Sequence, residues 1–120
     1  MLLDPMRLAP GWSVNRFTAT TPAGLKLLLD YNPRRVAVLI SSITASSNTV
    51  IGPYEMASTI EGFPMTGSPP MHHFDYSRFG GMVHLKWYAY SSFSGPSINV
   101  VEVVWNPELI PGARFWKDGE

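Results

Sequence analysis

The stretch from Arg34 to Ile43 constrains the fold more than any other part of this sequence. It reads Arg-Arg-Val-Ala-Val-Leu-Ile-Ser-Ser-Ile and follows the pair Asn32-Pro33. Proline fixes its own φ and disfavours the α region at the residue before it, so the chain should turn a corner here. On a strand the apolar side chains of this stretch fall on both faces: Val36, Val38 and Ile40 on one, Ala37 and Leu39 on the other. We therefore expect a central strand that is covered on both sides.

Shorter strand-like runs, separated by turn signals, fill much of the remaining chain. The 11 prolines and 10 glycines stand mostly between apolar runs, as they do in all-β domains. Further strands are expected at residues 14–20, 25–31, 49–52, 71–76, 82–90 and 98–105. This pattern predicts an all-β fold, a small β-sandwich or compact barrel of six to seven antiparallel strands with extended N- and C-terminal arms.

The segments between these strands are expected to be turns and loops. Residues 44–48 read as a hairpin loop and residues 77–81 as a turn, while 54–70 read as a long loop with one helical turn at most, at 54–58. In the strand at 82–90, alternation assigns four side chains to the core: Val83, Leu85, Trp87 and Ala89. Tyr88 and Tyr90 would then point away from the core.

Both ends of the chain are apolar but show no periodicity. At 120 residues a single domain is expected, with residues 14–105 forming the sandwich, 1–13 an N-terminal arm and 106–120 a C-terminal arm. Such arms need a surface to lie against, either on their own domain or, as we favour, on neighbouring subunits. The candidate interface residues in the arms, the long loop and the tyrosine strand are Leu2, Leu3, Met6, Leu8, Trp12, Phe63, Met65, Tyr88, Tyr90, Leu109, Ile110, Phe115 and Trp116.

The composition argues against several classes of protein. The chain is 45% hydrophobic and only 15% charged, with a formal net charge of zero, whereas a nucleic-acid-binding protein presents a basic face. It contains no cysteine, which excludes disulfides, thiolate catalysis and zinc–cysteine sites. No apolar run is long enough for a membrane-spanning helix, and the first residues lack the pattern of a signal peptide. We therefore expect neither nucleic acid nor a membrane among the partners.

Residues able to carry chemistry are present but not grouped in a known motif. His72, His73 and Asp75 are close in sequence, and His84 is the remaining histidine, but their spacing matches no zinc motif. The serines include no Gly-x-Ser-x-Gly elbow, the carboxylates select no pair for glycoside chemistry, and no phosphate-binding glycine loop occurs. We assign no catalytic, cofactor-binding or metal-binding residue, and we do not expect an enzyme.

The basic pair Arg34-Arg35 has two interpretations. Arginine suits a phosphate or a carboxylate of a neighbouring molecule. Two arginines at the start of a strand are more often solvated, or paired with a local group such as Asp30. We favour the local interpretation.

Several of these motifs together resemble a small β-sandwich found among structural proteins of tailed bacteriophages. The similar features are Asn32-Pro33-Arg34-Arg35 with its Val/Leu/Ile run, the polar hairpin and strand ending at Gly52, the aromatic run Trp87-Tyr88-Ala89-Tyr90, and the final run from Asn99 to Val104. The resemblance covers roughly residues 25–105, and the long segment at 54–70 departs from it. It implies a non-enzymatic virion component with no catalytic residue and no cofactor.

The function that this resemblance implies is that of a capsid decoration (cement) protein, which stabilises the phage head through subunit contacts. Its partners would be the major capsid protein or other virion subunits, as a homo-oligomer in the particle, and its location the virion, assembled in the host cytoplasm. Two alternatives remain open. One is a tail, baseplate or fibre-attachment component. The other is a carbohydrate-binding module that uses Tyr88, Tyr90 or Trp105.

Overall fold

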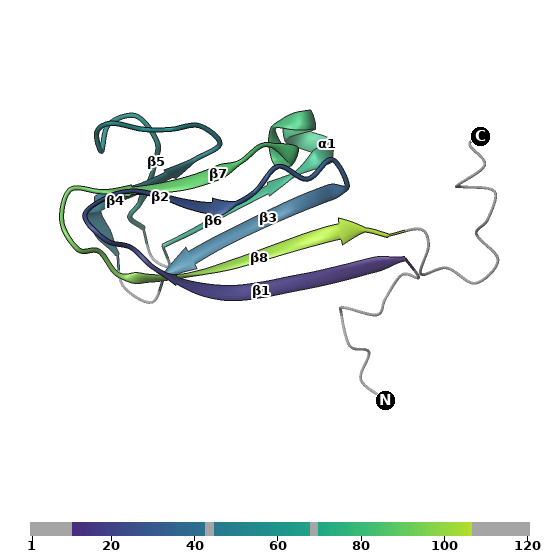
Figure 1. Cartoon of the computed structure of the whole chain (residues 1–120), viewed down its shortest axis with the longest axis horizontal. Coiled ribbons are helices and arrows are strands. Elements are labelled where there is room, and N and C mark those ends of the chain that lie inside the picture. Colours follow the sequence, from purple (N-terminus) through teal and green to yellow (C-terminus); the bar gives the residue numbers. More distant parts are fainter. Residues whose placement is uncertain (1–10, 43–44, 68–69, 107–120) are drawn as a thin grey trace.

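The protein is a sandwich of two four-stranded antiparallel sheets (Figure 1). The computed structural model describes residues 11–42, 45–67 and 70–106. The first sheet contains, in spatial order, β1 (Trp12–Thr20), β8 (Ser97–Trp105), β3 (Arg35–Ser42) and β6 (Met71–Asp75). The second contains β2 (Gly24–Leu29), β7 (Trp87–Ser91), β4 (Ser46–Gly52) and β5 (Phe63–Met65). The expected small β-sandwich is thus confirmed.

The strand order follows a simple rule. Strand β1 pairs with β8, β2 with β7, β3 with β6, and β4 with β5. These four pairings correspond to one long antiparallel ribbon of two chain segments. When the ribbon folds over on itself, β8 also pairs with β3, and β7 also pairs with β4. An eight-stranded double sheet connected in this way is a jelly roll.

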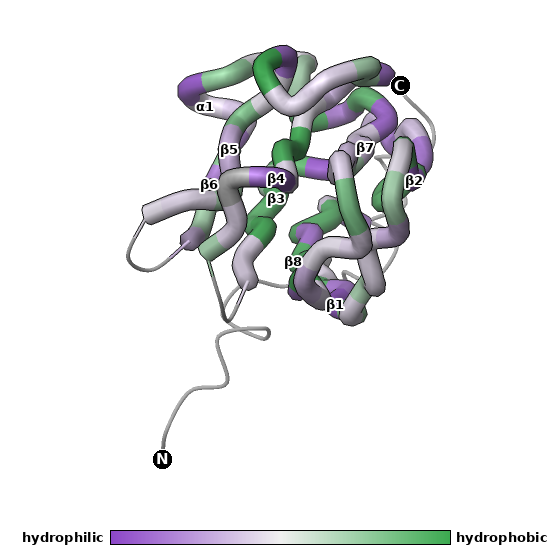
Figure 2. Tube along the Cα trace, turned by 90° about the vertical axis from the view of Figure 1, so that its left-hand side faces the viewer, coloured by the Kyte–Doolittle hydropathy of each residue, from purple (hydrophilic) through white to green (hydrophobic). Residues whose placement is uncertain are grey.

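The core lies between the two sheets, as the view along the strands in Figure 2 shows. On β3, Val38 and Ile40 are completely buried, while Ala37 and Leu39 on the other side of the strand are half-buried. Strand β3 lies between β8 and β6, so it is the central strand that its apolar run predicted. The largest side chain of the core is Trp87 of β7, which packs 4.7 Å from the ring of Phe74.

The segment between β6 and β7 differs from the sequence prediction. Instead of a turn and the start of a strand, it forms helix α1 (Tyr76–Phe79) and a 3₁₀-helix, η2 (Gly80–His84). Asp75 caps α1 by accepting the N–H of Arg78 at 2.9 Å, and Gly80 follows with a φ of +60°, where glycine is favoured. The strand predicted from residue 82 therefore begins only at Trp87, and Leu85 is exposed.

Four smaller differences concern the strands and the long loop. Strand β1 begins at Trp12, so that residue belongs to the first sheet and not to an arm. Strand β4 begins at Ser46, inside the predicted hairpin loop, and the short β5 was not predicted at all. Residues 54–58 form bends without a helical turn.

Candidate binding surfaces

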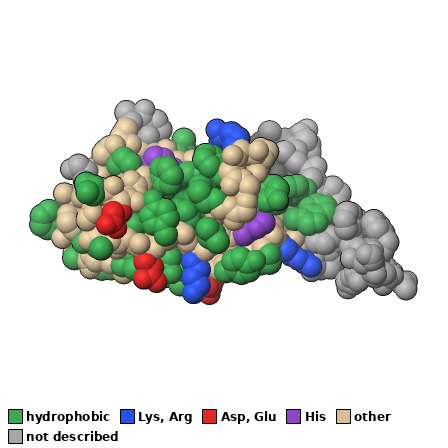
Figure 3. All heavy atoms as spheres, turned by 90° about the horizontal axis from the view of Figure 1, so that it is seen from above, with side chains coloured by type: hydrophobic (Ala, Val, Ile, Leu, Met, Phe, Trp, Pro, Cys, Tyr) green, Lys and Arg blue, Asp and Glu red, His purple; other side chains and the backbone are tan. Residues whose placement is uncertain are grey.

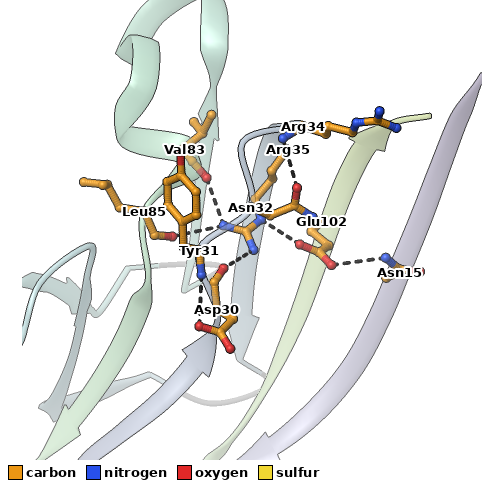
Figure 4. Close-up of polar contacts among 9 residues, drawn as sticks. All are labelled: Asn15, Asp30, Tyr31, Asn32, Arg34, Arg35, Val83, Leu85 and Glu102. Atoms are coloured by element: carbon orange, nitrogen blue, oxygen red, sulfur yellow. Dashed lines mark hydrogen bonds and ion pairs between the residues drawn. The ribbon is translucent and has the colours of Figure 1, made fainter. Parts of the chain in front are cut away.

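Arg35 is buried at the end of the sandwich and makes an extensive set of polar contacts (Figure 4). Its side chain is only 2% exposed, and its Nε donates to Glu102 Oε2 at 2.6 Å. Its Nη1 donates to the carbonyl oxygens of Val83 and Leu85, and its Nη2 donates to the carbonyl oxygen of Asp30 at 2.6 Å. A guanidinium occupied in this way is part of the fold and not a site for a phosphate.

These contacts refine the local interpretation of the arginine pair. Asp30 contributes its backbone carbonyl, whereas the ion pair is made with Glu102, which is 67 positions away in the sequence. Glu102 also accepts a hydrogen bond from Asn15 Nδ2 at 3.1 Å. The cluster thus joins β1, β8 and β3 to the corner before β3 and to the segment after η2, and it closes one end of the sandwich.

The histidines lie in three different surroundings. His72 Nε2 is 2.6 Å from the carbonyl oxygen of Pro64, His84 stacks on the ring of Tyr76 at 5.3 Å, and His73 is opposite Leu39 on β3. Among the residues that the structure describes, no group of three or more His, Asp or Glu side chains is arranged to hold a metal ion.

Asp75 has a structural role at the start of α1. It accepts hydrogen bonds from the hydroxyl of Ser77 at 2.9 Å and from the N–H of Arg78, and it pairs with the guanidinium of Arg78 at 3.2 Å. The Ser77 hydrogen bond, followed by those from Arg78, holds the pKa of Asp75 below its usual value. These partners favour the carboxylate over the protonated acid.

Buried hydroxyl groups gather beneath the loop between β7 and β8. Thr49 Oγ1 and Ser91 Oγ are 2.7 Å apart, and Thr21 Oγ1 donates to the carbonyl oxygen of Pro96 at 2.7 Å. The backbone of Gly95 lies directly against them: a Cβ at this position would be 2.7 Å from both Ser91 Oγ and Thr49 Oγ1 and would overlap Thr21 Oγ1. The hydroxyls bond one another and the loop, so this cluster holds the loop in place.

The outer face of the second sheet carries an exposed apolar patch, which we call the tyrosine face: Leu25, Leu27, Tyr88 and Tyr90. Leu25 is opposite Tyr90 and Leu27 is opposite Tyr88 across the β2–β7 pair. The two leucines are 39% and 45% exposed, and the tyrosines are half-buried. Figure 3 shows this side of the molecule, with hydrophobic side chains gathered across its middle. Such a face on an antiparallel sheet is ordinarily polar when it meets only water.

The loop from residue 53 to 62 lies beside the tyrosine face and covers β4. Met56 of the loop is buried, and so is Val50 of β4. The loop is closed by the hydroxyl of Tyr54, which donates to the carbonyl oxygen of Glu61 at 2.6 Å, and by the N–H of Ala57, which donates to Glu61 Oε1 at 2.8 Å. The loop makes one wall of the tyrosine face, and the Tyr88 hydroxyl is 3.5 Å from Glu55 Oε2 at this wall.

The outer face of the first sheet is also apolar, and we call it the valine face: Val14, Ala37, Leu39, Val101 and Val103. Val14, Val103 and Ala37 are in register across β1, β8 and β3, and Leu39 is opposite Val101. All five side chains are half-buried. At one end Trp12 packs edge-to-face on Trp105 with 5.4 Å between ring centroids.

Two shallow hollows lie along the valine face. One, of about 430 Å³, is lined by Trp12, Val36, Ala37, Val103 and the first residues of α1. The other, of about 380 Å³, is lined by Arg16, Phe17, Thr18, Asn99 and Val101. Because Val101 and Val103 are neighbours on the same face of β8, the hollows follow one another along that strand. Helix α1 borders this face, and none of the other described elements packs across it (Figure 1).

The candidate interface residues divide into three groups. Tyr88, Tyr90 and Trp12 lie on the two outer faces. Met65 is 0% exposed and Phe63 packs against the core, 5.1 Å from the ring of Phe74, so these two contribute to the core. The others lie outside the described residues: Leu2, Leu3, Met6, Leu8, Leu109, Ile110, Phe115 and Trp116.

The sequence analysis missed Leu25 and Leu27 as surface residues. Leu25, Leu27 and Leu29 alternate in sequence, which suggests a single face, but a β-bulge between Leu27 and Leu29 breaks the alternation. Leu29 is therefore buried in the core while the other two are exposed. No local pattern of residues in this stretch predicts the bulge.

Comparison with known proteins gives no relative: no family model matches the chain, and no curated protein matches its sequence. Within the described part of the chain, no helix has the length and apolar character needed to cross a membrane.

Proposed function

We propose that the protein is a non-enzymatic structural component of a bacteriophage virion, in the first instance a decoration protein that binds the head surface through the tyrosine face. The observation that carries this proposal is the tyrosine face itself. Exposed leucines and tyrosines gathered on a sheet surface mark a site of protein association, because tyrosine is enriched and charge is depleted in the centre of interfaces.

The topology and composition support the same function. Jelly rolls are common among viral capsid domains, although a fold alone does not assign a function. A net charge of zero with few charged residues is unfavourable for a protein that stays free in solution, whereas a subunit docked on a particle hides part of its apolar surface. The sequence resemblance to phage structural proteins points the same way.

In this function the sandwich would lie flat on the capsid, with the outer face of its second sheet as the contact surface. Leu25, Leu27, Tyr88 and Tyr90 would be buried against the capsid, and the loop 53–62 would form one edge of the contact. The leucines supply apolar area, worth about 25 cal/mol per Å² removed from water. The tyrosines add hydroxyls that can bond to the partner at the rim of the contact.

The test is co-sedimentation of the purified chain with heads of the phage that encodes it, prepared without this protein. We expect the wild type to pellet with heads, and Leu27→Asp with Tyr88→Ala to reduce the pelleted fraction by about tenfold or more, since two central interface residues cost at least about 1.4 kcal/mol together. The control is Phe93→Asp, at an exposed apolar side chain outside both the tyrosine face and loop 53–62, at 64% exposure. It should leave both pelleting and thermal stability unchanged.

Two results would overturn this assignment. If the wild type does not bind heads but is recovered with purified tails, the protein is a tail or baseplate component. If it binds neither, and Leu27→Asp with Tyr88→Ala behaves as the wild type in every fraction, the tyrosine face is not a virion contact.

A carbohydrate-binding function is the second candidate, because Tyr88 and Glu55 place an aromatic ring and a carboxylate side by side. Sugar sites combine a flat aromatic ring with polar groups, and jelly rolls also include lectins. Trp105 belongs to the opposite sheet and would not share such a site. Binding to a glycan array that is lost with both Tyr88→Phe and Glu55→Gln would favour this function over the virion contact, since neither change removes apolar area.

A further inference from the structure

We propose that two copies of this chain pair with one another through the outer edges of their β1 strands, which run antiparallel and join the two first sheets into one. This inference concerns a sheet edge that the proposed head contact does not use. It begins from the strand order β1-β8-β3-β6, which places β1 at one edge of the first sheet. Within the described part of the chain, no element pairs with the outer side of β1 (Figure 1).

Strand β1 lacks the features that protect the other sheet edges. It is nine residues long, pairs with β8 without a break in register, and contains neither proline nor glycine. By contrast, β5 has three residues and contains Pro64, β2 has a bulge between Leu27 and Leu29, and β6 has five residues and is followed directly by α1. A long regular edge is a template for pairing with another chain. Strand β1 is therefore the edge of the described sandwich to which a strand can best be added.

The backbone of β1 is oriented for this pairing. The N–H of Asn106 donates to the carbonyl oxygen of Gly11, and these two residues continue the register of the β1–β8 pairs. Because hydrogen-bonded and non-hydrogen-bonded pairs alternate in an antiparallel ladder, the odd-numbered residues of β1 bond to β8. The N–H and C=O groups of Val14, Thr18 and Thr20 consequently point outward, toward the position of an added strand.

The side chains of β1 select one register for two copies. The fully overlapping register places Arg16 opposite Arg16 of the second copy, and like charges directly opposite one another are destabilising. A shift of one pair places Phe17, which is 41% exposed, opposite Phe17 of the second copy, with Val14 opposite Thr20. The two rings then form a close, non-hydrogen-bonded aromatic pair. The opposite shift, centred on Asn15, would leave the rings apart.

The symmetry of this pair relates it to the tyrosine face. The two-fold axis between two antiparallel strands is perpendicular to the sheet, so equivalent faces of both copies point to the same side. Two tyrosine faces can therefore meet one surface, and lateral pairing on a head would rest on the head contact proposed above.

The size of the contact determines when it forms. A pair of strands about seven residues long, or about 24 Å, buries about 200 to 300 Å² on each copy, against about 800 Å² in a stable dimer. Free copies therefore pair only transiently. Copies held side by side on a common surface pair firmly, because their effective concentration is high.

Engineered cysteines can trap the transient pair, because the natural chain has none. Phe17→Cys is compared with Phe93→Cys, which replaces a more exposed side chain, 64% against 41%. In a concentrated sample of the free chain under mild oxidation, we expect Phe17→Cys to form a disulfide-linked dimer at least about tenfold faster, because its paired Cα atoms would be about 4.5 Å apart, within reach of a disulfide. Asn15→Cys is the register control. Its Cα atoms would be about 14 Å apart in the same pair, so it should react no faster than Phe93→Cys.

A proline tests whether the backbone edge makes the contact. Thr18→Pro in the Phe17→Cys chain removes one outward N–H and no hydrogen bond to β8, and proline is accepted at such positions of edge strands. We expect the rate of cross-linking to fall to that of Phe93→Cys, while thermal unfolding shows that the protein is still folded.

Three results would overturn the proposal. Equal rates for Phe17→Cys and Phe93→Cys would mean that dimers form by random collision. Fastest trapping of Asn15→Cys would exclude the register around Phe17. An unchanged rate with Thr18→Pro in a folded protein would mean that the contact does not use the edge of β1, and the comparison of the three cysteine variants decides alone if Thr18→Pro does not fold. Because these experiments need only the free chain, their failure leaves the head-binding test unaffected.

Discussion

Arg35 makes the cluster at the closed end of the sandwich sensitive to a single substitution. We expect Arg35→Met to lower the free energy of unfolding by about 3–5 kcal/mol, because it leaves Glu102 largely buried without its cation. Arg34→Ala, at an exposed neighbour in the sequence, should cost no more than about 1 kcal/mol. Urea denaturation of the two variants measures the difference.

The double variant Arg35→Met with Glu102→Leu separates two explanations. If the loss comes from an unpaired buried carboxylate, removing that carboxylate restores part of the stability. If the double variant is less stable than Arg35→Met alone, the carbonyl oxygens of Val83, Leu85 and Asp30 depend on the guanidinium more than Glu102 does.

Gly95 is the second residue whose replacement has a defined consequence. Its Cα lies against three buried hydroxyls, so Gly95→Ala should destabilise the protein by about 1–3 kcal/mol, as overpacking of a buried site does. At Gly81 a Cβ meets only His84 Nδ1 at 3.9 Å, and no positive φ is required. Gly81→Ala should therefore be neutral, or stabilise by about 0.4–1 kcal/mol through the unfolded chain. Opposite signs in thermal unfolding would support this account, and equal losses would contradict it.

At the scale of elements, helix α1 links pH to stability through its cap, Asp75. The pKa of Asp75 is lowered in the folded protein, so folding favours the carboxylate. Its contribution is complete above the unfolded pKa, about 3.9, and is lost as the pH falls through the lower folded pKa. Asp75→Asn keeps a good capping residue but removes the titration.

We predict that the wild type and Asp75→Asn differ in how steeply their melting temperatures depend on pH. Between pH 5 and pH 2 the melting temperature of the wild type should fall more steeply than that of Asp75→Asn, measured by circular dichroism. Toward the lowest pH, where Asp75 is protonated in both folded and unfolded states, the two proteins should approach one another. Parallel curves over the whole range would mean that the hydrogen bonds from Ser77 and Arg78 do not favour the charged form.

The elements also differ in how well the sequence predicts them. Strands β3 and β8 are rich in valine and isoleucine, and β1 alternates between turn signals; all three lie within two residues of the expected ranges. Helix α1 and the 3₁₀-helix were missed because they are only four and five residues long, too short for a helical period to be visible. The three-residue β5 depends on pairing with β4, which is a tertiary property.

The same limit applies to the candidate binding surfaces. Alternation along β7 is enough to place Tyr88 and Tyr90 outside and Trp87 inside. Their combination with Leu25 and Leu27 depends on the pairing of β2 with β7, and on a bulge that no local pattern specifies. Met65 looked like a loop residue, but it is buried because β5 joins the edge of the second sheet.

At the scale of the whole molecule, the sandwich has an apolar patch on both outer faces and no net charge to keep copies apart. A protein of this kind should associate weakly with itself when its partner is missing. The tyrosine face is the main candidate, because its leucines are more exposed than any side chain of the valine face. We therefore expect self-association of the wild type at high concentration, visible in sedimentation velocity.

Two variants that each add two positive charges distinguish the effect of the added charge on self-association from the effect of where that charge is placed. Leu25→Lys with Leu27→Lys introduces them on the tyrosine face, and Leu85→Lys with Phe93→Lys introduces them at exposed residues elsewhere. General repulsion would reduce association equally in both. If the tyrosine face is the contact, the first variant should remain monomeric at concentrations about tenfold higher than the second, since like charges then meet within the interface itself. Equal behaviour would move the self-association to another surface, and it would weaken the case that this face binds a virion partner.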